Sequence, residues 1–186
     1  MTDIHNVTAD ELHDFLLLDA KTGILRWKFR PISMFSGSGW MQERAWKTWN
    51  ARFADSAMTV GPMGYVRLSI NGRALKAHRV VWAMIYGKWP DGVIDHINGD
   101  TSDNRPENLR DVSHAENCRN QKQRSTNKTG RTGVSINARV GNFEAHITAD
   151  GKHIHLGYFE DFRNAVTARE QAEKNYGFHP NHARSA

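Results

Sequence analysis

The sequence predicts an α+β protein, and two stretches carry that prediction. Residues 93–120 follow the order strand, loop, strand, helix, because two short apolar runs flank a turn-rich loop and precede a helix-capping signal. Residues 133–176 contain three short runs separated by turn residues and then an amphipathic segment. This second stretch therefore predicts a small three-stranded antiparallel sheet with one helix.

The first 30 residues predict a helix and a strand. Thr8-x-x-Glu11 is a capping box, and apolar residues at mostly helical spacing extend the predicted helix over residues 9–19. After a Thr-Gly pair, residues 24–29 alternate apolar and cationic side chains. This alternation is typical of a half-buried strand with one solvated face.

A β-hairpin and a helix are predicted directly before the central stretch. Residues 65–70 and 73–77 flank Asn71-Gly72, which is a strong hairpin turn. Residues 78–86 then form an apolar helix that ends at Gly87. His78 is interpreted as a helix-start or core histidine and is left out of the candidate site.

Aromatic and basic side chains are mixed between these two segments. Such a mixture can stack on bases and hold phosphates. Spaced tryptophans more often form the core or the cover of a small domain, so that interpretation is favoured. The residues concerned are Trp40, Arg44, Trp46, Lys47, Trp49 and Arg52.

The central stretch carries polar side chains suited to metal-assisted cleavage of a phosphodiester. Asp95 and His96 lie on the first predicted strand. Asn108 opens the second strand, and a Ser-x-x-Glu capping box begins the helix that carries Asn117. Carboxylate and amide oxygens suit Mg²⁺ or a similar ion, which can stabilise the charge on the phosphate and the leaving oxygen. A neutral imidazole beside the ion can take a proton from the attacking water.

Two other metal sites are excluded by the residues present. A calcium-binding EF-hand loop that begins at Asp95 would need Gly at its sixth position and Glu at its twelfth, where the chain has Asp100 and Pro106. A structural zinc site lacks its ligands, because Cys118 is the one cysteine of the chain.

The central stretch resembles the HNH nuclease motif, the ββα-metal fold, in the version found in homing endonucleases of bacteriophages. The matching residues are Asp95-His96, Asn108-Leu109-Arg110 and Asn117. The resemblance implies that Asp95 and Asn117 bind a divalent metal, Mg²⁺ or Mn²⁺, and that His96 is the general base. It also implies that Asn108 holds the loop and helps to orient the site.

A basic, polar segment follows the central stretch. It has no acidic residue between 119 and 132, and it holds too little apolar surface to fold alone. It can be a flexible linker, a tether that neutralises DNA phosphates, or both, and the tether is favoured. Its cationic residues are Arg119, Lys122, Arg124, Lys128 and Arg131.

The three predicted C-terminal strands span residues 133–139, 143–148 and 153–159, and the helix spans 162–176. Alternation places Ala145 and Ile147 on the helix side of the sheet. The same rule places a set of polar residues on the open face. This set consists of Ser135, Asn137, Arg139, Glu144, His146, Thr148, His153 and His155.

The C-terminal stretch resembles the Apetala-type DNA-binding domain of plant ethylene-response factors, which also occurs fused to phage HNH nucleases. The matching residues are Gly133-Val134, Phe143-x-Ala145-x-Ile147, Leu156-Gly157-x-Phe159, Ala165 and Ala168. The resemblance implies that the sheet enters the major groove of double-stranded DNA. Several open-face positions are Arg or Trp in the plant domains but Ser, Asn and His here, so base contacts and target sequence do not carry over.

Composition agrees with a nucleic-acid partner. The formal net charge is +5, and the sequence pI is about 9.5, which favours a polyanionic partner. One cysteine argues against a disulfide framework, and we find neither an apolar run of membrane-spanning length nor a signal-peptide pattern. We therefore expect a soluble protein without a membrane partner, located in the cytoplasm (the host cytoplasm if phage-encoded).

These observations predict a metal-dependent HNH endonuclease that nicks or cleaves double-stranded DNA, in a homing-type role. The nuclease region is expected over residues 1–121 with its core at about 78–121, followed by a linker over 122–132 and the DNA-binding domain over 133–180. The alternatives are a DNA-binding protein that keeps the HNH fold only as a scaffold, and an RNA-binding or RNA-cleaving protein. The oligomeric state and the cleavage pattern stay open.

Overall fold

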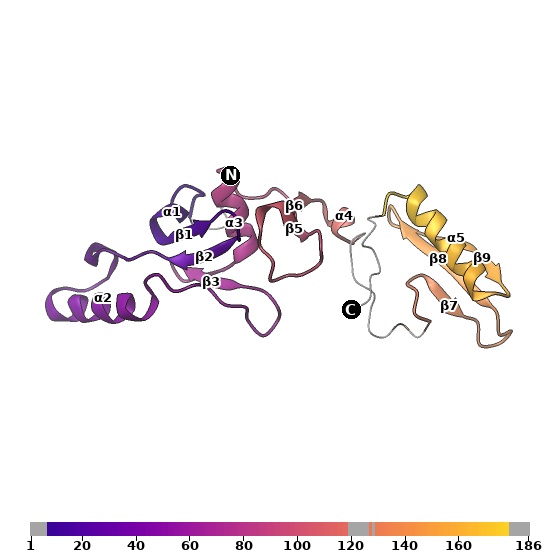
Figure 1. The fold of residues 1–186 in the computed structure, drawn as a ribbon, viewed down its shortest axis with the longest axis horizontal. Coiled ribbons are helices and arrows are strands. Elements are labelled where there is room, and N and C mark those ends of the chain that lie inside the picture. Colours follow the sequence, from indigo (N-terminus) through magenta and orange to yellow (C-terminus); the bar gives the residue numbers. More distant parts are fainter. Residues whose placement is uncertain (1–6, 119–126, 128, 179–186) are drawn as a thin grey trace. The chain divides into compact units, whose positions relative to one another are not determined.

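The computed structural model describes residues 7–118, 127 and 129–178 (Figure 1). The chain divides into two compact units. The first unit consists of residues up to His96 together with Asp100–Asp111, and the second consists of Ile97–Gly99 together with the residues from Val112 onward. Each unit has its own hydrophobic core.

The first unit is built from two-stranded sheets and helices, all of them short except α2. Strand β1 pairs with β2, β3 with β4, and β5 with β6. Its elements are α1 (Leu12–Phe15), β1 (Leu16–Asp19), β2 (Ile24–Trp27), the 3₁₀ helix η1 (Ile32–Met34), α2 (Gly39–Phe53), β3 (Arg67–Ile70), β4 (Arg73–Lys76), α3 (Ala77–Tyr86), β5 (Val93–His96), the 3₁₀ helix η2 (Pro106–Asn108) and β6 (Leu109–Val112).

The first predicted helix is correct at its start and wrong in its second half. The capping box forms, because the backbone N–H of Glu11 donates to Thr8 Oγ1 at 3.2 Å and that of Thr8 donates to Glu11 Oε2 at 2.7 Å. The helix ends at Phe15, however, and residues 16–19 form β1. Leu16 is buried whereas Leu17 is exposed, which is the alternation of a strand paired with β2.

The predicted hairpin and the helix after it are both confirmed. Asn71 and Gly72 have φ angles of 51° and 76°, as a two-residue turn with a left-handed backbone requires. Helix α3 ends at Gly87, whose φ is 69°. Val80 and Val81 of this helix are fully buried in the core of the first unit.

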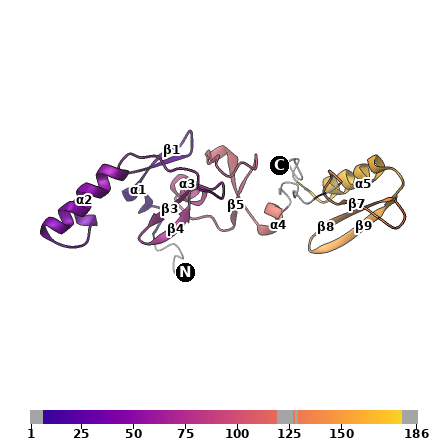
Figure 2. The ribbon, with the colours of Figure 1, turned by 90° about the horizontal axis from the view of Figure 1, so that it is seen from below.

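Helix α2 lies in the region where the sequence predicted no element. Figures 1 and 2 show it standing out from the rest of its unit. One of its faces holds the chain segment between β2 and α2, because the Trp46 indole N–H donates to the Arg30 carbonyl at 2.8 Å and Asn50 exchanges two hydrogen bonds with the Arg30 backbone. Trp46, and Trp49 through its ring contacts with Trp27 and Phe53, therefore serve as cover, as the favoured interpretation had it. Trp40 is exposed and does not fit that interpretation.

The second unit contains the predicted three-stranded antiparallel sheet, in the order β7-β8-β9, and a helix packed on one face of it. Ala145 and Ile147 are fully buried on the helix side. The elements of this unit are α4 (His114–Cys118), β7 (Val134–Ile136), β8 (Phe143–Ala149), β9 (Lys152–Phe159) and α5 (Phe162–Asn175).

The first strand of that sheet is shorter than predicted. It ends at Ile136, and Asn137 begins a turn in which its carbonyl accepts from the backbone N–H groups of Val140 and Gly141. Strand alternation therefore does not extend to Asn137 and Arg139. The turn arises because Val140-Gly141-Asn142 reverses the chain, with Gly141 at a φ of 78°.

A buried cation joins the helix to the sheet in the second unit. Arg169 of α5 is 3 % exposed, and it donates to the His146 carbonyl at 2.7 Å and to Glu173 at 2.9 Å. Burial lowers the pKa of Arg169, and the hydrogen bond and charge of Glu173 oppose that effect. None of the helices among the described residues has both the length and the apolar character needed to cross a membrane.

Candidate active site

The buried polar side chains of the first unit gather where β5, α3 and the β5–β6 loop meet. Most proteins bury such groups only where they are hydrogen-bonded or functional. Among the described residues of this unit, Asn50 is the one buried polar residue outside the group. The group consists of His78, Asp95, His96, Asn104 and Asn108.

Asp95 is fixed on β5 by an arginine from β6. The Nε and Nη2 atoms of Arg110 both donate to Asp95 Oδ2, at 2.8 and 2.7 Å. The Asp95 side chain is 9 % exposed and that of Arg110 is 30 % exposed, so the pair lies at the edge of the buried region. A buried carboxylate needs such compensation, because desolvation of its charge is costly.

His96 lies next to Asp95 on β5 and contacts a loop asparagine and a second histidine. Its Nε2 lies 3.2 Å from Asn104 Oδ1, and because an amide oxygen can only accept, this contact places the proton on Nε2. The rings of His96 and His78 meet edge to face with centroids 5.1 Å apart. Tyr65 approaches both rings, at 6.4 Å from His96 and 5.6 Å from His78.

The electrostatic environment keeps both imidazoles neutral near pH 7. Burial lowers the pKa of His78 to about 3, with further lowering from His96, Lys76 and Arg79. Burial also lowers the pKa of His96, although the Asn104 hydrogen bond and nearby carboxylates, Asp95 first, act in the opposite direction. A neutral imidazole is the form that can accept a proton.

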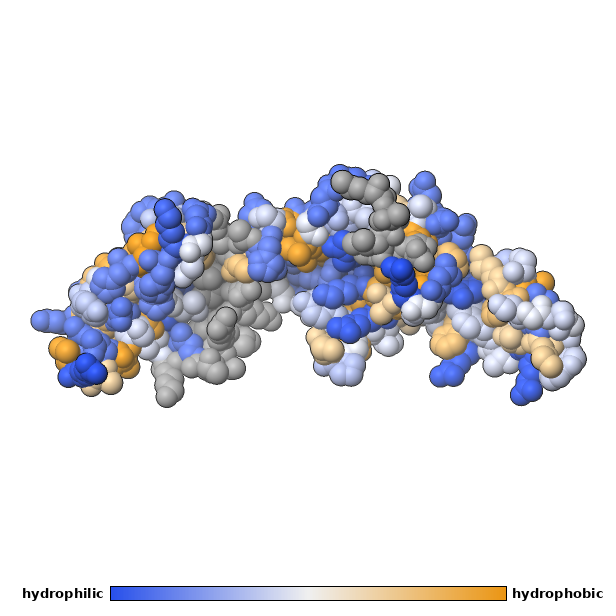
Figure 3. All heavy atoms as spheres, turned by 180° about the vertical axis from the view of Figure 1, so that it is seen from behind, coloured by the Kyte–Doolittle hydropathy of each residue, from blue (hydrophilic) through white to orange (hydrophobic). Residues whose placement is uncertain are grey.

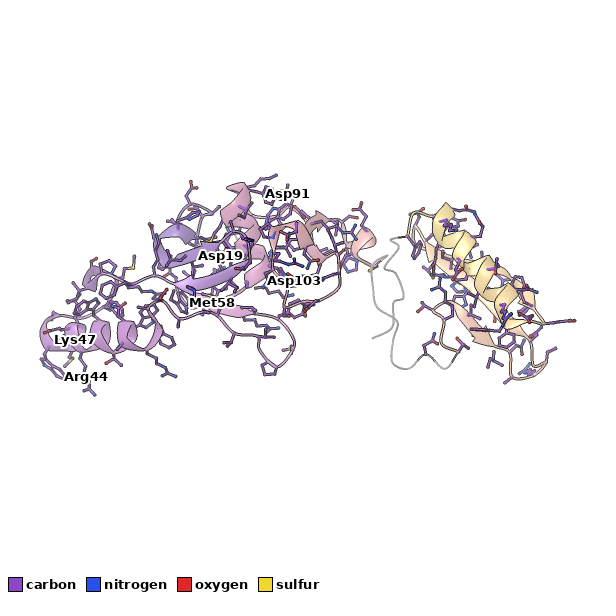
Figure 4. The ribbon with its side chains drawn as sticks, in the orientation of Figure 1. Asp19, Arg44, Lys47, Met58, Asp91 and Asp103 are labelled. Atoms are coloured by element: carbon purple, nitrogen blue, oxygen red, sulfur yellow. The ribbon has the colours of Figure 1, made fainter. Side chains whose placement is uncertain are left out.

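Hydrogen bonds within the loop between β5 and β6, and one to the segment before β3, fix the conformation of the loop. Asn108 Nδ2 donates to the Asp103 carbonyl at 2.8 Å, and Arg105 forms a two-pronged ion pair with the Asp103 carboxylate, which Figure 4 labels. Thr101 Oγ1 donates to the Gly64 carbonyl at 2.7 Å and ties the loop to the segment before β3. These bonds position Asn104 against His96.

The N-terminal hairpin also supports this loop. Gly23, in the turn between β1 and β2, has a φ of 70°, and a Cβ added there would lie 2.1 Å from the Asn104 carbonyl oxygen. The backbone of the hairpin and that of the loop are therefore in direct contact. Residues before the predicted nuclease core thus help to position Asn104.

Gly23→Ala is expected to destabilise the first unit and displace Asn104. The added methyl group clashes with a backbone carbonyl, so we expect a loss roughly 2 kcal/mol larger than that of Gly72→Ala. Gly72 is a matched control, because its φ is 76° and nothing lies within 4 Å of an added Cβ. All six tryptophans lie before residue 90, so urea unfolding followed by tryptophan fluorescence reports this unit. Equal losses in the two variants would contradict the contact.

The remaining predicted metal ligand, Asn117, and the predicted DNA contact Arg131 belong to the second unit. Asn117 lies in α4 and is half-buried, and the predicted capping box forms, with the Glu116 N–H donating to Ser113 Oγ at 3.2 Å. Arg131 is 18 % exposed and pairs with Glu173 at 2.7 Å, so its charge is compensated within the fold. The predicted residues Arg119, Lys122, Arg124 and Lys128 lie outside the described residues.

The prediction of a divalent ion rests on the chemistry of the two predicted ligands and not on an observed cluster of metal-binding side chains. A buried carboxylate at Asp95 and the amide oxygen of Asn117 are oxygen donors of the kind Mg²⁺ takes, with water completing its coordination. Within the part of the chain that the structure describes, no group of three or more His, Cys, Asp or Glu side chains is arranged to hold an ion. A shared ion between Asp95 and Asn117 stays a prediction.

The predicted DNA-binding residues of the sheet lie together on its open face. Ser135 pairs with Glu144, His146 with His155, and Thr148 with His153 in the register of the sheet, which places each pair on the same side. The rings of His146 and His153 are 4.8 Å apart, and His155 Nδ1 lies 3.2 Å from Glu144 Oε1. Burial lowers the pKa of His146, with further lowering from His153 and Arg169.

Three residues of the site were not predicted from the sequence. Asn104 stands among other loop asparagines and aspartates, and nothing in the pattern distinguishes it. Arg110 was noted only as context of Asn108, although its place on the strand opposite Asp95 was a usable signal. His78 was interpreted as a core or helix-start residue, and it is indeed buried at the start of α3, but it also contacts His96.

Comparison with known proteins bears on this part of the chain. Residues 75–119 match the HNH endonuclease family. No curated protein and no solved structure matches the chain. The matched residues run from β4 through the Asp95-His96 pair to α4, so the family likeness covers the buried polar group and supports a nuclease that acts on DNA.

Proposed function

We propose that the chain is a metal-dependent DNA endonuclease that hydrolyses a phosphodiester at Asp95 and His96. The observation that carries the proposal is a buried, neutral histidine beside a buried carboxylate, inside a stretch that matches the HNH endonuclease family. A phosphodiester hydrolase needs both a proton acceptor and a site for a cation.

In this mechanism His96 accepts the proton of the attacking water. With Asn104 Oδ1 accepting from Nε2, the neutral ring has its proton on Nε2, and Nδ1 is the nitrogen that takes the proton. The water oxygen bonds to phosphorus, and the bond from phosphorus to the leaving deoxyribose oxygen breaks. Asp95 and Asn117 would hold a divalent ion, Mg²⁺ or Mn²⁺. When bound, such an ion neutralises charge on the phosphate and on the leaving oxygen.

The other residues of the site position these groups. Arg110 fixes the Asp95 carboxylate, and Asn108 fixes the loop that carries Asn104. His78 packs edge to face against His96 and limits the positions that its ring can take. These are positioning roles, because none of the three is proposed to contact the reacting atoms.

The C-terminal unit is proposed to bind double-stranded DNA with the open face of its sheet. Polar side chains fill that face, and helix α5 covers the other. The proposed binding residues on that face are Ser135, His146, Thr148, His153 and His155. Asn137 and Arg139, in the turn after β7, and the basic segment before the sheet are proposed to add to them. An Apetala-type domain over residues 133–180, the linker over 122–132 and a phage homing role belong to the same proposal.

Conversion of supercoiled plasmid to nicked or linear DNA tests this function. The wild-type chain is expected to cut with Mg²⁺ or Mn²⁺ and to stop when a chelator is added. Binding of the plasmid without cutting under either metal would favour a DNA-binding protein on an HNH scaffold. Cutting of single-stranded RNA in preference to duplex DNA would favour the RNA alternative.

A further inference from the structure

Helix α2 has one face committed to the fold. Gln42, Trp46 and Asn50 recur at every fourth position and hydrogen-bond the chain segment before the helix. Gln42 Nε2 donates to the Phe35 carbonyl at 2.8 Å, and the indole of Trp49 is packed by Trp27, Phe35 and Phe53. These contacts fix the position of α2 in its unit.

An adjacent face of α2 is open and hollowed. A pocket of about 480 Å³ lies along it, with Trp49 and Phe53 among its apolar walls. Trp40 and Met41 flank the pocket near the start of the helix and are 66 % and 62 % exposed. Figure 3 shows hydrophobic and hydrophilic residues mixed around α2, which lies at the right of that view.

Two arginines line the same pocket, and no carboxylate among the described residues pairs with either. Arg44 and Arg52 form no ion pair with the described residues, and Figure 4 shows Arg44 directed away from the body of the unit. Glu43 is the one acidic residue of α2, and it is paired with Lys47 at 2.6 Å. The two arginines lie eight residues apart, which is about 12 Å along a helix.

The combination of an apolar pocket with unpaired arginines decides which partner fits. An apolar helix, or the same face of α2 from a second copy, would bury both guanidinium groups without a free counter-charge, which is costly. An unpaired nucleotide instead supplies an aromatic face for the tryptophan and a phosphate for each arginine. Duplex DNA offers the phosphates but keeps its bases stacked.

We propose that this face of α2 binds a single-stranded segment of nucleic acid, with a base stacked on Trp40 and phosphates on Arg44 and Arg52. The choice of nucleic acid as partner rests on the proposed function. The site is separate from the buried polar group around His96 and uses none of its residues. It gives the first unit a contact with its substrate that does not depend on the C-terminal sheet.

Binding of fluorescent 20-mers to the full-length chain tests the proposal. A His96→Ala background prevents cleavage, and oligo-dT, oligo-rU and a mixed-sequence duplex are compared. Trp40→Ala is expected to weaken binding of one or both single strands about tenfold and to leave duplex binding within twofold. Arg44→Gln/Arg52→Gln is expected to weaken single-strand binding. It is also expected to lower the steepness of log K against log salt concentration by about 1.4.

Matched variants separate this site from a general charge effect. Lys21→Gln/Arg67→Gln removes two exposed cations elsewhere in the same unit, and it is expected to change single-strand binding less than twofold. The proposal is overturned if this control matches the α2 double variant, or if Trp40→Ala leaves single-strand binding unchanged. It is also overturned if Trp40→Ala weakens duplex and single strands alike, or alters only self-association in sedimentation.

These assays can reject the nuclease activity and the α2 site independently of each other. Loss of oligonucleotide binding in the α2 variants, with no plasmid cutting by the wild type, would leave the α2 site standing and reject the nuclease. Plasmid cutting by the wild type, together with unchanged oligonucleotide binding in the variants, would support the nuclease and reject the α2 site.

Discussion

His96→Ala is expected to lower the rate of metal-dependent plasmid nicking by about 10²- to 10⁴-fold, the usual contribution of a general base. The variant loses the proposed proton acceptor, while Asp95 and its partner Arg110 remain. The measurement is the initial rate of nicking under saturating Mg²⁺. His96→Gln, which keeps a polar group beside Asn104, is expected to lose as much activity with a smaller loss of stability.

The pH dependence of the wild type provides the second readout. His96 must be neutral to accept a proton, and burial lowers its pKa below the ordinary value of 6.5. Nicking is therefore expected to persist through pH 6.5 and to fall only at lower pH, as His96 becomes protonated. An acid limb centred above pH 6.5, or a limb that survives in His96→Gln, would contradict the assignment. Tryptophan fluorescence checks that each protein remains folded over this range.

Local signals in the sequence predicted most elements because their chemistry is local. The Asn71-Gly72 turn, the two capping boxes and Gly87 at the end of α3 act over a few residues, and each forms as expected. The sequence is less decisive where a distant partner determines the outcome. Leu16 and its neighbours have helical spacing, yet pairing with β2 makes them a strand.

The residues of the candidate site also fall into two groups, those that the local sequence identifies and those that only the fold brings to the site. Asp95 and His96 are recognisable because they are adjacent and lie in a family motif, and they are buried together. Asn104 and His78 join them only through the folded loop and helix, over separations that no periodicity reveals. Gly23 contacts Asn104 although the two lie far apart in the sequence, and only the structure brings them together.

Asp95→Asn is expected to lower nicking at least about 100-fold, because the amide removes the anionic ligand proposed for the divalent ion. The change keeps the shape of the side chain but not its ion pair with Arg110. Arg110→Gln removes that pair and leaves the carboxylate. It is expected to keep more activity than Asp95→Asn but to lower the stability of the first unit by roughly 1–3 kcal/mol, because the Asp95 side chain is mostly buried.

Metal binding then has a readout that does not require activity. If Asp95 holds the ion, Mg²⁺ or Mn²⁺ should raise the urea midpoint of Arg110→Gln, since a ligand that binds only the folded state stabilises it. The double variant Asp95→Asn/Arg110→Gln should show no such gain. An equal gain in both proteins would mean that the ion binds elsewhere, and Asp100 and Asp103 of the same loop would be the next carboxylates to replace. A larger gain in Arg110→Gln than in the wild type would show that the ion and the guanidinium compete for the Asp95 carboxylate.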